Sequence, residues 1–220
     1  MHQTIKNFLN INTQIKTKIN ELKYNNYKAE IVAVSKTFPI NHILPLIEHG
    51  HTHFGENKVQ EALEKWSDIK VKNKNIKLHM VGKLQTNKVK TALKIFDFIH
   101  SLDNLKLAKK ISDEQKKNNT RPKIFIQINI GNEIQKSGIS TQNLQDFLNE
   151  CKKLDLNIIG TMCLPPLNQN PGIFFSQMEK INNNLNLKDL SMGMSEDYLN
   201  AIEYHSTYLR IGSKIFGLRN

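Results

Sequence analysis

The stretch Ile31–Gly55, IVAVSKTFPINHILPLIEHGHTHFG, holds a strand, a helix and a second strand in succession. A β-branched apolar run, Ile31–Ser35, comes first, a helical pattern follows at Asn41–His49, and a second short run covers Thr52–Gly55. Two strands joined through a helix lie parallel in one sheet, and their crossover is right-handed. The stretch therefore predicts a parallel α/β fold.

The same alternation continues along the chain. Further β-branched runs occur at Ile76–Val81, Phe98–His100, Ile124–Asn129, Ile158–Met162, Asp189–Ser191 and Thr207–Ile211. Helical stretches between the runs include Lys58–Lys65, Asn87–Ile95, Leu105–Lys117, Gln142–Lys152 and Glu196–Tyr204. Before the first run, apolar residues from Ile5 to Leu22 recur every three or four positions, which indicates an amphipathic helix. The pattern predicts a closed (β/α)8 TIM barrel with a leading N-terminal helix, and an open doubly wound sheet is the alternative.

The length of 220 residues fits one domain, and we expect residues 1–220 to form it. Hydrophobic residues make up 39% of the chain and charged residues 23%, which is ordinary for a folded globular protein. No window approaches about 18 consecutive apolar residues, and the amino terminus lacks the apolar core of a signal peptide. We therefore expect a cytoplasmic protein without a membrane span. Cys151 and Cys163 form no CxxC pair, so we expect neither a disulfide framework nor a cysteine-type zinc site.

Basic residues are in excess, with 31 Lys and Arg against 20 Asp and Glu, a formal net charge of +11. Nine lysines lie between Lys65 and Lys94, a cluster that could contact phosphates without reading a base sequence. Arginine is scarce, however, and aromatic residues are not interleaved with these lysines as they are in a stacking platform for bases. The surplus also extends over the whole chain. Nucleic-acid binding is therefore the disfavoured interpretation.

In a (β/α)8 barrel the reactive groups lie on the loops that follow the strands. The chemically distinctive residues of this sequence take those positions. They are Lys36 after the first run, Asn57 after the second, Gly82 after the third, Lys136 after the fifth, Met162 at the end of the sixth, Gly193–Ser195 after the seventh and Gly212–Ser213 after the eighth. We therefore expect the functional site at the carboxyl ends of the strands.

Two of these loops have the features of a phosphate site. The turn Ser191–Ser195, SMGMS, runs into a helix, whose free backbone N–H groups can bind an anion. Arg210–Ser213, RIGS, brings a second glycine and hydroxyl to the adjacent loop, where such barrels often bind phosphate. The alternative is that Ser195 only caps the helix, with Glu196 and Asp197 as ordinary first-turn acids. The paired loops favour phosphate, on the condition that the two acids point away from it.

Lys36 closes an apolar strand, which places an amine at a dry barrel mouth. Burial and a neighbouring cation such as Arg210 both lower the pKa of a lysine, and a neutral amine condenses with an aldehyde to form an imine. An amine on the first strand opposite a phosphate site on the seventh and eighth fits a phosphorylated aldehyde. Pyridoxal 5'-phosphate is the obvious cofactor that carries both groups.

Six blocks of sequence resemble one protein family, in order and along nearly the whole chain. They are IVAVSKTFP around Lys36, HFGENKVQE around Asn57, HMVGKLQTNK from His79 to Lys88, EIQKSGI around Lys136, LSMGMSEDYLNAI from Leu190 and RIGSKIFG from Arg210. The family is that of the pyridoxal phosphate homeostasis proteins, single-domain barrels related to the amino-terminal domain of alanine racemases. The resemblance implies a commonly monomeric protein that holds pyridoxal 5'-phosphate and buffers it or delivers it, with apo enzymes that depend on this cofactor as candidate recipients.

The resemblance also implies a role for each site residue. The implied cofactor-binding residues are Lys36 (Schiff base), Asn57 (lining the cofactor), Ser195, Gly212 and Ser213 (phosphate) and Arg210 (pyridine nitrogen). A guanidinium cannot release its proton, so the ring nitrogen facing it stays unprotonated and the ring is a weak electron sink. Two positions depart from the family pattern, Lys58 for tyrosine and Ser213 for threonine, and the serine keeps the hydroxyl.

Two other functions fit parts of the sequence. A racemase or decarboxylase of the alanine-racemase type would use the same cofactor, but such enzymes have a further β-domain, and about ten residues follow the last predicted strand. A metal-dependent hydrolase is suggested by His49, His51 and His53, because HxH spacing occurs in metal sites. These histidines precede or begin the second strand and so belong to the other end of the barrel. We therefore expect a carrier of the cofactor rather than an efficient enzyme, and no metal.

Overall fold

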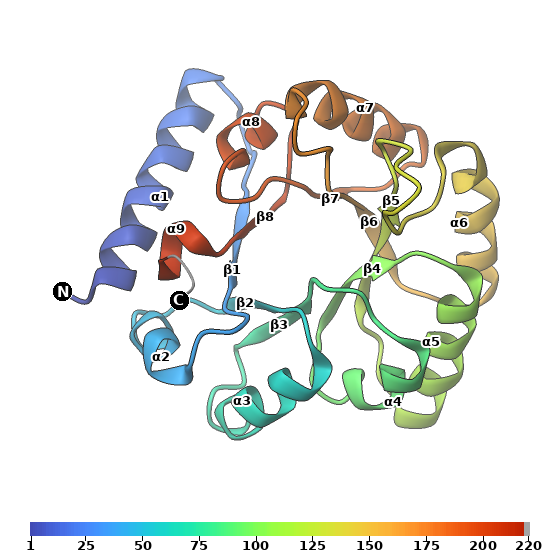
Figure 1. The fold of residues 1–220 in the computed structure, drawn as a ribbon, viewed down its shortest axis with the longest axis horizontal. Coiled ribbons are helices and arrows are strands. Elements are labelled where there is room, and N and C mark those ends of the chain that lie inside the picture. The colour runs from blue at the N-terminus through green and yellow to red at the C-terminus, as the bar shows by residue number, and fades with distance from the viewer. Residues whose placement is uncertain (218–220) are drawn as a thin grey trace.

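The structure, a computed structural model, describes residues 1–217 and contains a closed barrel of parallel strands (Figure 1). The strands are β1 Glu30–Val34, β2 His53–Glu56, β3 Lys77–Met80, β4 Phe98–Leu102, β5 Lys123–Ile128, β6 Ile158–Cys163, β7 Asp189–Ser191 and β8 Tyr208–Ile211. Each strand pairs with the next along the chain, and β8 closes the barrel by pairing with β1, with Glu30 opposite Tyr208 and Ala33 opposite Ile211. The closed order confirms the predicted (β/α)8 barrel and excludes the open doubly wound sheet.

Helices surround the barrel (Figure 1). They are α1 Gln3–Glu21, α2 Ile40–Glu48, α3 Val59–Lys72, α4 Val89–Ala92, α5 Leu105–Asn118, α6 Leu144–Lys153, α7 Pro171–Asn184, α8 Tyr198–Ile202 and α9 Ser213–Phe216, with the short 3-10 helices η1 Thr86–Lys88 and η2 Thr141–Asn143. The leading helix α1 buries Phe8, Ile11 and Ile15 and packs against α2, α8 and α9, as its apolar spacing predicts. No helix within residues 1–217 is both long enough and apolar enough to cross a membrane.

Some helices differ from the ranges predicted from the sequence. The stretch Asn87–Ile95 is divided between η1 and α4, and α8 is shorter than Glu196–Tyr204. The cause at α8 is a side-chain hydrogen bond, because the Met194 N–H donates to Asp197 Oδ1 at 2.6 Å and holds the preceding residues in a turn. Helix α7 lies outside the predicted ranges. Asn170 begins it by accepting from the Gly172 N–H at 2.9 Å.

The main apolar core lies between the barrel and its helices, whereas the barrel interior is aromatic and polar. Phe98, Phe125 and Met162 form a small apolar cluster of their own there. His79 stacks on Phe98 with ring centroids 4.1 Å apart, and His100 stacks on Phe125 at 4.4 Å. Barrels of this kind are usually filled by branched aliphatic side chains. The buried histidines depart from this composition and bring polar groups into the barrel interior.

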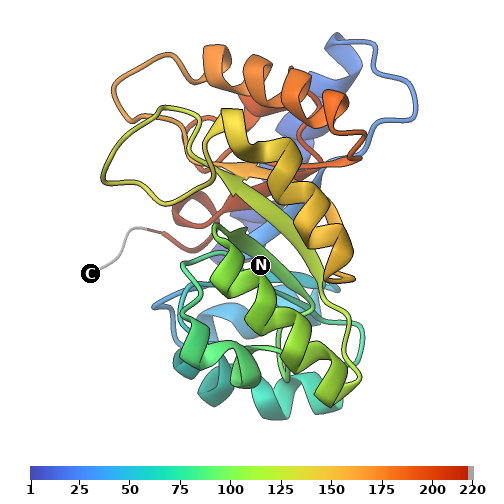
Figure 2. The ribbon, with the colours of Figure 1, turned by 90° about the vertical axis from the view of Figure 1, so that its right-hand side faces the viewer.

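The two ends of the barrel are built differently. Figure 2 shows the loops after β5 and β6 projecting on the left, at the carboxyl ends of the strands. The connection from α1 to β1 lies on the right, at the amino ends of the strands. The end with the longer projecting loops is the one where the sequence predicts the functional site.

Candidate functional site

A cleft of about 680 Å³ opens at the carboxyl ends of the strands. Its wall includes the ends of the loops after β1, β6, β7 and β8. Among the residues that line it are Lys36, Ser195, Arg210, Gly212 and Ser213, which are five of the six predicted cofactor-binding residues. A volume of this size suits a small organic ligand, since such sites typically measure about 300–1,000 Å³. The predicted residues therefore converge in space, apart from Asn57.

Hydrogen bonds on both sides of Lys36 fix its position at the end of β1. The buried Ser35 hydroxyl donates to Glu56 Oε1 at 2.8 Å, which ties the end of β1 to β2. Thr37, whose φ of 66° is unusual for a side chain with a branched Cβ, donates its N–H to Glu61 Oε1 at 2.6 Å. The backbone that carries Lys36 is therefore held on a rigid strand end, which favours a precise position for a reactive amine.

A buried ion pair behind β1 supports this arrangement. Glu56 is fully buried, and its Oε1 accepts from Lys65 Nζ at 2.9 Å and from Trp66 Nε1–H at 3.0 Å. Lys65 Nζ also donates to the Ser35 carbonyl at 3.0 Å. In the sequence, Lys65 ends a predicted helical stretch and begins a basic cluster, and neither pattern reveals its two partners. The available signal was a carboxylate inside a short buried strand, which requires a partner.

Three hydrogen-bonding groups converge where the loops after β7 and β8 meet. Ser195 Oγ accepts from the Gly212 N–H at 3.3 Å and from the Lys214 N–H at 3.4 Å. Both contacts are long for hydrogen bonds, so the serine oxygen engages the two N–H groups only weakly. An anionic oxygen is a stronger acceptor for the same donors. A Cβ at Gly212 would lie 3.1 Å from the Val34 carbonyl oxygen, so this position has little space for a side chain. The serine hydroxyl and the two backbone N–H groups form a cradle that fits a phosphate.

The structure does not place Ser195 as the cap of a helix. Helix α8 begins at Tyr198 with Asp197 as its cap residue, and the Ser195 hydroxyl faces the loop after β8 instead. Glu196 and Asp197 both contribute to the cleft wall, so the rim retains negative charge. Their opposition to an anion is reduced, because Asp197 Oδ1 accepts from the Met194 N–H and Glu196 is exposed to water.

Arg210 reaches into the barrel from β8 and is almost completely buried. One of its terminal nitrogens donates to Ser191 Oγ at 2.6 Å and the other donates to the Cys163 carbonyl at 2.8 Å. Burial lowers the pKa of this guanidinium from a value far above neutrality, so the group remains a cation. Because Arg210 also lines the cleft, the site contains a rigidly held group that can only donate hydrogen bonds.

A chain of three histidines connects Arg210 to the opposite end of the barrel. Ser191 Oγ lies 2.7 Å from His100 Nδ1, His100 Nε2 lies 2.8 Å from His79 Nδ1, and His79 Nε2 lies 2.9 Å from His53 Nδ1. In the sequence, His53 stands out only through its HxH spacing with His49 and His51, and nothing connects it with His79 or His100. No local pattern could do so, because the three rings come from three different strands.

Arg210 also determines which nitrogen of each histidine carries the proton. The guanidinium only donates, so the Ser191 oxygen accepts from it, and His100 Nδ1 is the acceptor left for the Ser191 proton within the described residues. Neutral His100 then donates through Nε2 to His79 Nδ1, and neutral His79 donates through Nε2 to His53 Nδ1. His53 is therefore left with its proton on Nε2.

Burial keeps two histidines of the chain, and His51 beside α1, in the neutral form. It lowers the pKa of His79 and His100 well below the usual value, and it lowers the pKa of His51 to about 4. In the unfolded chain the same groups take up a proton near pH 6.5. The unfolded state therefore binds more protons than the folded state below that pH. The corresponding stability is present above about pH 6.5 and is lost as the pH falls towards the folded-state values.

We expect the free energy of unfolding to fall by about 1 kcal/mol for each of His51, His79 and His100 between about pH 7.5 and pH 5.5. Chemical denaturation at the two pH values measures the change. Carboxylates with a lowered pKa, such as that of Glu61, lose their contribution only below about pH 4.5, so they do not obscure it. His42→Gln, at an exposed histidine, is the control and should keep the profile. Equal stability at both pH values would contradict the neutral state of His51, His79 and His100.

Asn57 lies beside the cleft rather than on its wall. Its backbone packs against the loop after β3, where a Cβ at Gly82 would be 2.4 Å from the Asn57 carbonyl oxygen. Within residues 1–217 its buried Oδ1 has no hydrogen-bond partner. Buried polar atoms are rarely left without a partner, so this oxygen suits a bound molecule that can donate to it.

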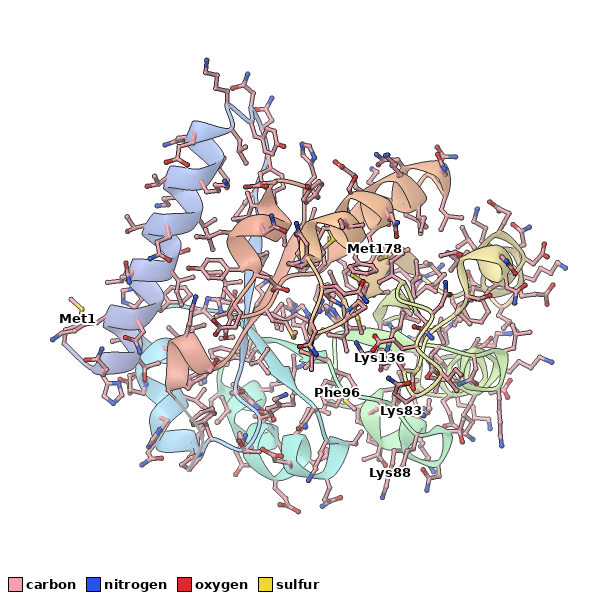
Figure 3. The ribbon with its side chains drawn as sticks, turned by 45° about the horizontal axis from the view of Figure 1, so that its top comes forward. Met1, Lys83, Lys88, Phe96, Lys136 and Met178 are labelled. Atoms are coloured by element: carbon pink, nitrogen blue, oxygen red, sulfur yellow. The ribbon has the colours of Figure 1, made fainter. Side chains whose placement is uncertain are left out.

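A smaller cleft of about 280 Å³ adjoins the first along Leu164. Lys83 and Lys136 both line it, and Figure 3 shows these two labelled lysines close together on the loops after β3 and β5. Lys136 Nζ pairs with Glu133 Oε2 at 2.5 Å and donates to the Pro165 carbonyl at 3.2 Å. Lys136 therefore stabilises its own loop and lies outside the cleft that Lys36 lines, which we call the main cleft.

The histidines with HxH spacing do not come together around a common ion. His51 Nε2 lies 2.8 Å from the His53 carbonyl, and the ring of His49 is 6.3 Å from that of Phe8. In the part of the chain that the structure describes, no three His, Cys, Asp or Glu side chains are arranged to hold a metal.

Comparison with known proteins points to one family. A family model described as the alanine racemase N-terminal domain matches residues 12–220. A pyridoxal phosphate homeostasis protein of Haemophilus influenzae is 35% identical over 221 residues, covering 96% of this chain and 93% of the relative. A protein of the same name from Mus musculus is 36% identical over 210 residues, covering 86% of this chain and 77% of the relative.

Solved structures share the barrel. PipY of Synechococcus elongatus, solved with PLP bound, has a TM-score of 0.81 and 30% identity, and the match covers 92% of this chain and 100% of PipY. An alanine racemase of Clostridium difficile has a TM-score of 0.71 at 13% identity, with 94% of this chain and 57% of the racemase covered. At that identity the likeness extends to the fold alone.

Proposed function

We propose that this chain, which belongs to the family of pyridoxal phosphate homeostasis proteins, binds pyridoxal 5'-phosphate in the cleft at the carboxyl ends of its strands. The observation that carries the proposal is the convergence of three kinds of group on one cleft. An amine, an anion cradle and a buried guanidinium all line it, at Lys36, Ser195 with Gly212, and Arg210. These groups match the aldehyde, the phosphate and the ring nitrogen of the cofactor, respectively.

Each residue has a specific part in this proposal. Lys36 Nζ would hold the cofactor as a Schiff base, because an aldehyde condenses with a primary amine and the carbonyl oxygen leaves as water. The hydroxyls of Ser195 and Ser213 and the N–H of Gly212 bind the phosphate. Arg210 donates to the pyridine nitrogen. In support, the Gly212 N–H is directed at Ser195 Oγ, and Arg210 is fixed from behind by Ser191 and by the Cys163 carbonyl. Asn57, with its unpartnered buried oxygen, completes the surroundings.

The proposed role is to hold the reactive aldehyde and to buffer it or deliver it to apo enzymes, in the cytoplasm and as a monomer with one domain. Two features favour a carrier over a catalyst. Arg210 keeps the ring nitrogen unprotonated, which weakens the stabilisation of a carbanion. Along the wall of the cleft, the described residues provide neither a tyrosine nor a histidine that could act as a general acid or base. A racemase or decarboxylase of the alanine-racemase type is the alternative.

Amino acids should exchange only slowly onto the imine of the loaded protein, a step in which the incoming amino group displaces the Lys36 amine. The loaded protein is incubated with alanine and with other amino acids in deuterated water, and α-proton exchange, racemisation and decarboxylation are followed together with transfer of cofactor to an apo enzyme. Typical enzymes turn over about 10 times per second, and we expect rates far below that. Transfer without turnover supports the carrier. A rate near the enzymic value for any amino acid would replace the carrier by the racemase-type function.

A further inference from the structure

A second cleft, of about 700 Å³, lies at the amino ends of the strands, on the opposite side of the barrel from Lys36. Its wall comes from strand ends and the segments that lead into them, including Glu30 of β1, Lys77 of β3 and Tyr208 of β8. The volume again falls in the range of about 300–1,000 Å³ that is typical of sites for small organic ligands. Nothing in the proposed handling of pyridoxal 5'-phosphate uses this cleft.

The charges around this cleft, which we call the amino-end cleft, are mainly positive. Its lining includes the cations Lys70, Lys77, Lys94, Arg121 and Lys123, and the carboxylates Glu30 and Asp97. Five cations minus two carboxylates leave an excess of three positive charges when His53 is neutral. A concave surface of one sign concentrates its field and attracts ions of the opposite sign.

The carboxylates already have partners. Asp97 Oδ2 accepts from Lys70 Nζ at 2.6 Å and from the Leu78 N–H at 2.7 Å, so its charge is largely compensated. Glu30 lies 3.5 Å from the exposed Lys28. Arg121 pairs with Asp155 outside the cleft, at 2.8 Å.

Three lysines of the amino-end cleft have no carboxylate partner. Within residues 1–217, no carboxylate oxygen lies within ion-pair distance of Lys77, Lys94 or Lys123. All three are exposed to solvent at the cleft and are therefore available to a ligand. Lysine is a common ligand of phosphate groups because it presents a compact charge with three donors.

Aromatic surface lies next to these lysines. Phe96, Phe98 and Tyr208 line the amino-end cleft, and the Phe98 and Tyr208 ring centroids are 5.6 Å apart. Lys123 Nζ lies 5.3 Å from the centroid of the Phe98 ring. Phe96 and Phe98 are almost completely buried, and His79 already stacks on Phe98, so the half-buried ring of Tyr208 is the aromatic surface that the cleft offers. Such a surface suits a planar organic group, whereas a bare inorganic anion does not require it.

The histidine chain adds a hydrogen-bond donor to the amino-end cleft. His53 lines the amino-end cleft and accepts from His79 through Nδ1, at 2.9 Å, so its proton is on Nε2. No acceptor for this Nε2–H lies within the described residues. The buried chain that begins at Arg210 thus ends in a hydrogen-bond donor inside a positively charged cleft.

We propose that the amino-end cleft is a binding site for a small organic phosphate, a planar ring that carries a phosphate group. Lys77 and Lys123 bind the phosphate, Tyr208 contacts the ring, and His53 donates from Nε2 to an oxygen of the ligand. The amino-end cleft shares no lining residue with the main cleft, so this proposal and the proposed cofactor site can fail independently of each other.

Adenosine 5'-monophosphate is a suitable probe, because it combines a planar base with one phosphate. It is titrated into ¹⁵N-labelled protein that has been loaded with pyridoxal 5'-phosphate and freed of excess cofactor, because free cofactor is itself a planar ring with a phosphate and would compete for the amino-end cleft. Amide shifts are followed by NMR. We expect saturable shifts at Leu78, Asp97 and Phe98, at the amino ends of β3 and β4. The amides of Gly193 and Gly212 should not move. Adenosine without phosphate should bind at least about tenfold more weakly, because charge-assisted hydrogen bonds are lost.

Variants of the exposed lysines test the assignment without disturbing the core. Lys77→Ala and Lys123→Ala should each weaken adenosine 5'-monophosphate by about tenfold, and Lys16→Ala, on the exposed face of α1, should leave its affinity unchanged. The proposal is overturned if no saturable shift occurs up to about 10 mM, if the shifts lie at Gly193 and Gly212, or if all three variants bind equally. Equal binding of adenosine and its monophosphate would overturn the phosphate assignment.

Discussion

Lys36→Ala should abolish the visible absorption band that the protein acquires with pyridoxal 5'-phosphate. The band of a Schiff base requires an amine within bonding distance of the aldehyde carbon, and Lys36 is the lysine that lines the main cleft among the described residues. Ser35 and Thr37 on either side are held by Glu56 and Glu61, so the substitution removes the amine without releasing the strand end. Weak noncovalent binding through the phosphate should remain, and equilibrium dialysis measures it.

The matched control for this substitution is Lys83→Ala. Lys83 is an exposed lysine of the neighbouring small cleft, so its loss changes the net charge equally and leaves the main cleft intact. The Lys83 variant should keep both the band and the affinity. A band of unchanged intensity in the Lys36 variant would contradict the assignment of the amine.

Pyridoxal 5'-phosphate should bind far more tightly than unphosphorylated pyridoxal. The cradle offers two or three charge-assisted hydrogen bonds from Ser195, Ser213 and the Gly212 N–H, and each such bond contributes about 1.5–3 kcal/mol. The expected preference is therefore about 3 kcal/mol or more, which is at least on the order of 10²-fold in Kd. Titration of the apo protein with each form, followed by absorbance, measures the ratio.

Substitutions in the cradle should act on the phosphorylated form specifically. A side chain at Gly212 has little space, because its Cβ would lie 3.1 Å from the Val34 carbonyl, so Gly212→Leu should weaken pyridoxal 5'-phosphate and leave pyridoxal nearly unchanged. Ser213→Thr keeps the hydroxyl and should keep the preference, whereas Ser213→Ala should reduce it. Equal affinities of the wild-type protein for the two forms would exclude a phosphate site in this cleft.

The barrel could be predicted from the sequence because its units are local. Each strand is a short apolar run, and Asp189–Ser191 was predicted with the bounds that the structure has. Helix ends were less predictable, since they depend on single side-chain contacts. The contact of Asp197 with the Met194 N–H shortened α8, and no periodic pattern encodes it.

The candidate site was predictable to the extent that it depends on topology. Once the strands form a closed parallel barrel, residues that follow β1, β7 and β8 meet at one end, as Lys36, Ser195 and Gly212 do. Contacts that depend on register could not be predicted. His100 and Ser191 are 91 positions apart, and their hydrogen bond exists only because β4 and β7 both direct these side chains into the barrel. The Glu56–Lys65 pair was missed for the related reason that it requires knowing which face of α3 is buried.

The most direct test of the proposed cofactor site is reductive trapping in the wild-type protein. The protein is loaded with pyridoxal 5'-phosphate, reduced with borohydride, digested and examined by peptide mass analysis. We expect a phosphopyridoxyl group on the peptide that contains Lys36. A group on another lysine, such as Lys83 or Lys136, or no group in protein that has bound the cofactor, would contradict it.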